Sequence, residues 1–211
     1  MSRLPQCPAI FISLADSIIN TQLTCPGLRA SLKTNYTQYV LETNRLRLRR
    51  LTLNDARFIL ALLNEPSFLQ NIGDKQVRSL EDARSYLING PIASYRRYGY
   101  GLYAVERRES QVVMGICGLV RREGLEETDL GFAFLPFFWG KGYAVEAASA
   151  IMTQAREEIG LRQVVAITIP DNHRSIRVLE KVGLRFQKMI RLSEEGKALR
   201  LYSRALSTVS T

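Results

Sequence analysis

The sequence contains few of the residues that metal centres and disulfide frameworks require. Its 211 residues include three cysteines, Cys7, Cys25 and Cys117, and a single histidine, His173. Three scattered cysteines are too few for a disulfide framework or a four-ligand zinc site, and one histidine cannot build a histidine-rich metal centre. We therefore expect no metal site. The low cysteine content also favours a reducing compartment, so we expect a cytoplasmic protein.

Long hydrophobic runs are absent as well. No apolar stretch approaches the roughly 20 residues that a membrane-spanning helix needs, so we expect no membrane partner. Hydrophobic residues make up 46% and charged residues 23% of the chain, which is typical of an ordinary globular protein. This balance excludes collagen-like, low-complexity and wholly disordered classes. A chain of this length fits one domain, or one domain plus an extension, and can bury a core without cross-links.

The chain is basic, with 29 Lys and Arg against 20 Asp and Glu and a formal net charge of +9. Such a charge favours anionic partners, for example a phosphorylated cofactor, an acidic peptide or RNA, but a basic surface without a specific partner explains it equally well. The densest basic segment, residues 45–50, alternates arginines with leucines. That alternation is typical of a strand with one exposed face, so we do not expect a nucleic acid as substrate.

The first forty residues differ in character from the rest. They carry few charges, contain Pro5, Pro8 and Pro26, and show no sustained helical or strand period. A secretory signal is disfavoured because the prolines interrupt the short apolar stretch and no small-residue cleavage site follows. We interpret residues 1–40 as an N-terminal extension, either mobile or the product of a misassigned start, and residues 41–211 as the folded domain.

From residue 45 onward, strand and helix periods alternate, as in a mixed α/β domain. Alternating or continuous apolar patterns predict strands at 45–51, 102–107, 112–120, 128–135, 164–169, 185–191 and 199–206. Apolar residues at helical spacing predict four helices, at 52–65, 79–90, 143–159 and 172–182. We expect Pro66 to end the first helix and a turn at Gly90 and Pro91 to end the second.

A glycine-rich turn, Phe-Trp-Gly-Lys-Gly-Tyr-Ala at 138–144, stands between a predicted strand and the strongest predicted helix. Glycines at a helix start let backbone N–H groups approach an anion, and the helix dipole adds partial positive charge there. The alternative is a turn that only redirects the chain. A P-loop is excluded because Gly142 stands where Ser or Thr is required, and a dinucleotide fingerprint is excluded because Val145 stands where a third Gly or Ala is required.

Two motifs in order, Trp-Gly-Lys-Gly-Tyr-Ala-Val-Glu-Ala at 139–147 and Pro-Asp-Asn-His-Arg-Ser-Ile-Arg-Val-Leu-Glu-Lys-Val-Gly at 170–183, resemble those of the GNAT acetyltransferase family. Within that family the chain resembles the branch that contains the ribosomal-protein N-terminal acetyltransferases. The resemblance extends over about residues 41–206. It implies an α+β fold of GNAT type, with a central, mostly antiparallel twisted sheet of about six to seven strands flanked by about four helices.

The resemblance also implies how acetyl-CoA, the co-substrate, is bound. The strand before the glycine turn would pair through its backbone with the pantetheine arm, at Phe132, Ala133, Phe134 and Leu135. The pyrophosphate would lie on the backbone N–H groups of Trp139, Gly140, Lys141, Gly142, Tyr143 and Ala144. Asn172 would reach the same cofactor, and Ser175 would lie near its sulfur. The phenylalanines could instead be core residues, Asn172 a helix cap and Ser175 an uninvolved helix residue.

For catalysis, the resemblance points to an acid near the start of the central strand as the general base, and Asp129 occupies that place. The alternative is that Asp129 is a solvated charge and that water accepts the proton. Many relatives protonate the departing thiolate with a tyrosine where this chain has Leu179. The hydroxyl of Ser175 is then the expected partner of the sulfur. We do not expect a catalytic role for His173.

The function implied is transfer of an acetyl group to a primary amine by direct attack in a ternary complex, with a protein or peptide N-terminus as the expected acceptor. An α-amine, with a pKa of about 8, is more easily neutral than a lysine, with a pKa of about 10.4. Acids at positions 123, 126, 127 and 129 keep a small cationic amine, such as a polyamine or aminosugar, open as acceptor. A non-catalytic acyl-CoA-binding module is the third hypothesis. The assembly is expected to be a monomer or a homodimer.

Overall fold

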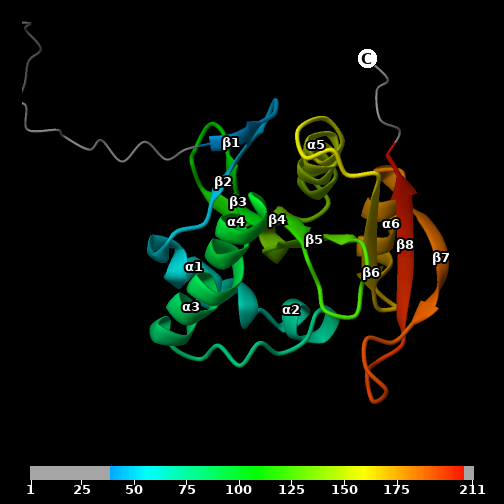
Figure 1. Ribbon diagram of the computed structural model, residues 1–211. Helices are drawn as coiled ribbons and strands as arrows, with labels where there is room; N and C mark the ends of the chain where they lie inside the picture. The colour runs from blue at the N-terminus through cyan, green and yellow to red at the C-terminus, as the bar shows by residue number, and fades with distance from the viewer. Residues whose placement is uncertain (1–38, 207–211) are drawn as a thin grey trace, which may run out of the picture. The chain divides into compact units, whose positions relative to one another are not determined.

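An eight-stranded sheet runs through residues 39–206, the part of the chain that the computed structural model describes (Figure 1). The strands are β1 Tyr39–Glu42, β2 Leu46–Arg50, β3 Leu102–Arg107, β4 Val113–Val120, β5 Thr128–Phe134, β6 Gln163–Thr168, β7 Arg185–Ile190 and β8 Leu199–Ala205. Their order in the sheet is β1-β2-β3-β4-β5-β6-β8-β7. Every neighbouring pair is antiparallel except β5 and β6, which are parallel.

Six α-helices flank the sheet within the described residues: α1 Ala56–Leu63, α2 Pro66–Asn71, α3 Leu80–Leu87, α4 Ala93–Tyr98, α5 Tyr143–Glu157 and α6 His173–Lys181. Strand alternation sends successive side chains to opposite faces. In β3, Tyr103 and Val105 pack with α5 and α6, whereas Ala104 packs with α1 and α3. The sheet is therefore covered on both faces (Figure 1).

The predicted α+β architecture is confirmed, but the sheet has eight strands rather than six or seven, and the described residues form six α-helices rather than about four. The additional strand is β1, which forms a hairpin with β2. Its sequence, Tyr-Val-Leu-Glu, does not alternate, so pairing with β2 rather than local pattern makes it a strand. The expectation for residues 1–40 falls, up to residue 38, outside the described residues.

Two predicted helix ends were wrong. Pro66 does not end a helix but occupies the first turn of α2, where the missing N–H of a proline costs nothing. Gly90 and Pro91 do not form a terminating turn either, because a π-helical segment, Ile88–Ile92, joins α3 to α4. The wider turn accommodates the buried proline within a continuous helical path. That path ends at Gly99, whose φ is 80°.

The predicted start of α3 at Ser79 is confirmed. The hydroxyl of Ser79 accepts a hydrogen bond from the Asp82 backbone N–H at 3.1 Å, and the Asp82 carboxylate accepts one from the Ser79 backbone N–H at 2.9 Å. This is the expected capping box. None of the helices in residues 39–206 is long and apolar enough to cross a membrane.

Candidate functional site

The sheet opens between β5 and β6. These strands pair only at Thr128 with Val164 and at Asp129 with Val165, whereas the pairing of β5 with β4 continues to Phe134. One edge of β5 beyond Asp129 therefore has no partner strand among the described residues.

The hydrogen-bond pattern shows which groups that edge presents. Leu135 N–H donates to the Met114 carbonyl at 3.0 Å, on the β4 side. Because successive residues of an antiparallel ladder point their polar groups to alternate sides, Phe134 and Phe132 point theirs toward the opening. The Phe134 carbonyl is bonded to the indole Nε1–H of Trp139 at 2.7 Å. The Phe132 polar groups and the Phe134 N–H are thus presented at the unpaired edge.

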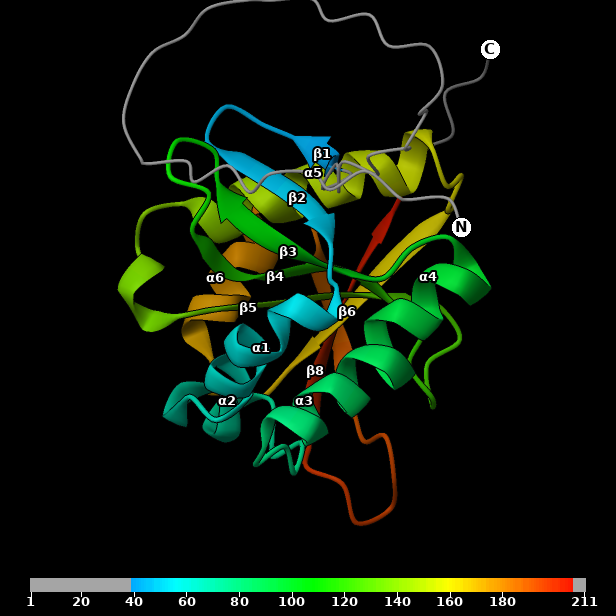
Figure 2. The same cartoon turned by 90° about the vertical axis from the view of Figure 1, so that its left-hand side faces the viewer.

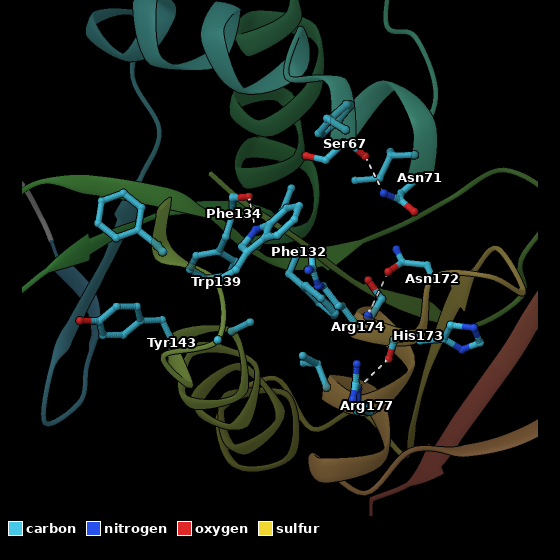
Figure 3. A pocket seen from close by; sticks show the side chains of 18 of the residues that line it. Ser67, Asn71, Phe132, Phe134, Trp139, Tyr143, Asn172, His173, Arg174 and Arg177 are labelled. Atoms are coloured by element: carbon cyan, nitrogen blue, oxygen red, sulfur yellow. Dashed lines mark hydrogen bonds between the residues drawn. The ribbon is translucent and has the colours of Figure 1, made fainter. Parts of the chain in front are cut away.

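A cleft of about 830 Å³ lies at this opening (Figure 3). We call it the central cleft. Its walls come from β5, the glycine turn, the first turns of α5 and α6, and α2. Of the predicted cofactor residues, it brings together Phe132, Ala133, Phe134, Trp139, Gly140, Gly142, Tyr143, Ala144, Asn172 and Ser175.

Two predicted cofactor residues lie outside the walls of the central cleft. Leu135 packs instead against the core cluster beneath α1 and α3. The Lys141 ammonium lies 4.4 Å from the centroid of the Phe137 ring, whose side chain is 77% exposed. Any contribution of Lys141 to the central cleft therefore comes from its backbone.

The glycine turn presents free backbone N–H groups. Gly140 and Gly142 have φ values of 75° and 82°, a left-handed conformation that glycine adopts without strain. The Trp139 N–H already donates to the Pro136 carbonyl at 3.1 Å, as the 3-10 turn Pro136–Phe138 dictates. The N–H groups of residues 140 to 144 have no backbone acceptor among the described residues, since α5 begins at Tyr143 and its first turn has no intrahelical partners.

A second helix begins at the central cleft. Asn172 caps α6, and its Oδ1 accepts a hydrogen bond from the Ser175 backbone N–H at 3.1 Å. The cap leaves the Nδ2 group of Asn172 and the Ser175 hydroxyl at the cleft wall. With α5 and α6 both starting here, the positive ends of two helix dipoles converge on the same space.

Basic side chains of α6 extend this positive environment, and the sequence reasoning missed them. Arg174, Arg177 and Lys181 line the central cleft, and the Arg174 guanidinium lies 4.7 Å from the centroid of the Trp139 ring. Their spacing of three and four residues places them on one helix face. That pattern was visible in the predicted helix and could have identified them.

The opposite wall comes from α2. Ser67 and Asn71 line the central cleft there, and the Asn71 Nδ2 group donates a hydrogen bond to the Ser67 carbonyl at 2.7 Å (Figure 3). Glu65 also lines the cleft. These residues were missed because Pro66 was interpreted as the end of a helix rather than the start of one.

Asp129 lies where β5 and β6 separate, outside the residues that line the central cleft. Its side chain is buried, and its Oδ2 accepts hydrogen bonds from Arg122 Nε at 2.9 Å and Nη2 at 2.7 Å. Its Oδ1 is buried. Burial raises the pKa of Asp129 above its usual range, although the ion pair with Arg122 and the backbone N–H of Ile167 act in the opposite direction.

The other residues considered for catalysis or acceptor binding lie in the core, at the rim of the central cleft or outside it. Leu179 is 1% exposed and packs in the core, so no hydroxyl is offered from that position. His173 begins α6 at the rim of the central cleft. Glu123, Glu126 and Glu127 are exposed in and beside the β4–β5 loop rather than in the cleft walls.

Comparisons with known proteins agree with this geometry. Residues 45–185 match the family model described as acetyltransferase (GNAT) domain. The chain is 31% identical over 170 residues to the uncharacterized protein YkkB of Bacillus subtilis (strain 168), which covers 78% of this chain and 94% of YkkB. It is 28% identical over 153 residues to the uncharacterized N-acetyltransferase YoaA of the same strain, covering 72% and 86%.

Among solved structures, the fold is similar to that of the ribosomal L7/L12 α-N-protein acetyltransferase RimL in complex with coenzyme A. The TM-score is 0.69 at 19% sequence identity, over 80% of this chain and 98% of that one. At this identity the similarity concerns the fold.

Proposed function

Because the chain belongs to the GNAT acetyltransferase family, we propose that it moves an acetyl group from acetyl-CoA to the α-amine at the N-terminus of a protein or peptide. The observation that carries the proposal is the unpaired edge of β5 next to the free N–H groups of the glycine turn. An extended amide-containing arm can pair with the β5 edge, and a diphosphate can bind the N–H groups of the glycine turn.

The described residues fit acetyl-CoA. The Phe132 polar groups would pair with the pantetheine amides, and the N–H groups of residues 140 to 144 would hold the diphosphate. A Cβ built on Gly140 would meet nothing within 4 Å, so this position is open space beside the backbone. When bound, acetyl-CoA supplies an acetyl group activated as a thioester.

The transfer needs an oxyanion donor, a base and a partner for the sulfur. The amine nitrogen bonds to the acetyl carbon, the carbon–sulfur bond breaks, and the amine loses a proton. The Phe134 N–H would stabilise the oxyanion. Asp129, which lies outside the cleft walls, would accept the proton through an intervening water, and burial makes this carboxylate more basic than an exposed one. The Ser175 hydroxyl would donate to the departing sulfur.

An α-amine is the acceptor that this arrangement serves most readily. With a pKa of about 8, about a tenth of an α-amine is neutral at pH 7, whereas a lysine amine at about 10.4 is almost fully charged. The polar α2 wall, with Ser67 and Asn71, offers hydrogen-bonding groups to a peptide backbone. One observation favours a small cationic amine instead, namely the Glu65 carboxylate in the same wall.

The test is an acceptor panel. Purified protein is incubated with acetyl-CoA and with peptides carrying a free N-terminus, the same peptides with a blocked N-terminus and an internal lysine, polyamines and aminosugars. Release of free thiol and the acetylated product are measured. We expect turnover with free N-termini only. Turnover confined to small amines would mean that the acceptor is a small amine rather than a peptide N-terminus. CoA binding without turnover of any amine would favour a non-catalytic module.

A further inference from the structure

Arg45, in the loop between β1 and β2, connects that hairpin to the glycine turn. Its Nη1 donates to the Lys141 carbonyl at 3.0 Å, and its Nε donates to the Glu146 Oε2 at 2.6 Å. Its backbone N–H donates to the Glu146 Oε1 at 3.0 Å, and the Thr43 hydroxyl donates to the same oxygen at 2.6 Å. The guanidinium lies 4.7 Å from the centroid of the Tyr143 ring. We call these contacts the Arg45 bridge.

The Arg45 bridge determines which way a peptide group of the turn points. In a trans peptide, the carbonyl oxygen and the following N–H point in opposite directions. Since the Lys141 carbonyl points toward Arg45, the Gly142 N–H points away from Arg45. Gly142 lines the central cleft, and Arg45 does not. Arg45 lines a separate hollow of about 430 Å³, whose lining shares only Tyr143 with that of the central cleft. The bridge therefore aims the Gly142 N–H into the central cleft.

The bridge also neutralises a charge that would oppose an anion. Glu146 lies in the first turn of α5, next to the proposed diphosphate position. Burial opposes the charged form of Glu146, but the hydrogen bonds from Thr43 and Arg45 outweigh it and lower the pKa of this carboxyl. Glu146 is thus ionised at neutral pH. Without Arg45, its negative charge would repel a phosphate at the helix start.

We propose that Arg45 is a positioning residue for diphosphate recognition, which orients the Gly142 N–H toward the central cleft and neutralises Glu146 without touching the cofactor. The Arg45 bridge joins segments 101 residues apart and holds the β1–β2 hairpin to the start of α5. Figure 2 shows this hairpin beside α5. This inference rests on the proposed function, because it takes the anion at the turn to be the diphosphate of CoA.

The test compares two acetyl donors in the full-length chain. Acetyl-CoA carries the diphosphate, and S-acetylpantetheine lacks it. Arg45→Gln should weaken CoA binding, measured by calorimetry, roughly tenfold and raise the KM for acetyl-CoA while kcat stays unchanged. The same variant should keep its kcat/KM with S-acetylpantetheine. A merely structural role would reduce activity with both donors.

Two further variants sharpen the test. Arg107→Gln is the matched control, because Arg107 lines the same hollow, has similar exposure and pairs with Glu109 rather than with the glycine turn. It should leave both donors unaffected. Glu146→Gln added to Arg45→Gln should restore part of the CoA affinity, since the uncompensated charge is removed.

The outcomes separate this inference from the proposed function. Arg45→Gln protein that binds CoA as tightly as the wild type, or that loses activity equally with both donors, would overturn the role of Arg45 alone. Wild-type protein that binds no CoA would overturn the proposed function and this inference together.

Discussion

The indole Nε1–H of Trp139 donates to the carbonyl of Phe134 at 2.7 Å. This hydrogen bond ties the glycine turn to the last residue of β5, so the two proposed cofactor-binding features are held in one fixed relation. It also occupies the Phe134 carbonyl, so the Phe134 N–H and the polar groups of Phe132 are left for a ligand at the unpaired edge.

Trp139→Phe should weaken CoA binding several-fold and lower the free energy of unfolding by about 1 kcal/mol, because the Phe134 carbonyl loses its donor. The variant retains an aromatic ring that can pack against Arg174. Calorimetry with CoA and urea unfolding followed by circular dichroism would measure the two effects. Unchanged CoA affinity would show that the tie between turn and strand is not needed for binding.

Gly140→Asp should abolish measurable CoA binding while the protein remains folded, because Gly140 lines the central cleft, a Cβ there meets no atom within 4 Å, and the carboxylate would lie beside the N–H groups that would hold the diphosphate. The matched control is Gly160→Asp, since Gly160 has a similar left-handed φ of 72° but lies beyond the far end of α5. Both variants should lose about 1 kcal/mol of stability from backbone strain. Equal CoA affinity in the two variants would mean that the diphosphate is bound elsewhere.

Asp129→Asn should lower kcat/KM by roughly a hundredfold or more if Asp129 accepts the amine proton. In the wild type, kcat/KM should fall as the pH drops through the pKa of Asp129, which burial places above the usual range of a carboxyl. The variant should lack this contribution and keep only the fall caused by protonation of the acceptor amine, whose pKa is about 8. Initial rates over a pH series with a free-N-terminus peptide would measure both effects.

Glu127→Gln is the control for Asp129, because Glu127 is an exposed acid two residues earlier on the same chain segment. It should keep the wild-type rate and pH profile. An Asp129→Asn protein with the same profile as the wild type would assign proton removal to water and leave Asp129 as the anchor of Arg122.

The basic side chains of α6 should make CoA binding sensitive to salt. Lys181→Gln should weaken binding at low ionic strength and reduce its dependence on salt, because it removes one of the charges that line the central cleft. Lys188→Gln, on the exposed strand β7, should change neither. Calorimetry at several sodium chloride concentrations would distinguish them, and identical salt dependence of Lys181→Gln and the wild type would exclude this contact.

Local pattern was sufficient for most elements of the fold. The apolar stripe at 143–159 predicted α5 within about two residues, and the Ser79 capping box fixed the start of α3. Local pattern gave the wrong prediction at residues that are compatible with two local structures. Pro66 can end one helix or begin the next, and Pro91 can break a helix or sit in a π-helical segment. Burial and packing of the neighbouring elements decide between these states.

The sequence by itself determined the glycine turn, the helix that follows it and the capping residue Asn172, because short-range geometry imposes each of them within a few residues. Only the tertiary structure decided that β5 and β6 separate after Asp129, that Arg122 forms an ion pair with the Asp129 carboxylate, and that the Arg45 bridge holds the glycine turn. These relations join groups that are distant along the chain, and no local preference encodes which long-range partner a carbonyl or carboxylate will find.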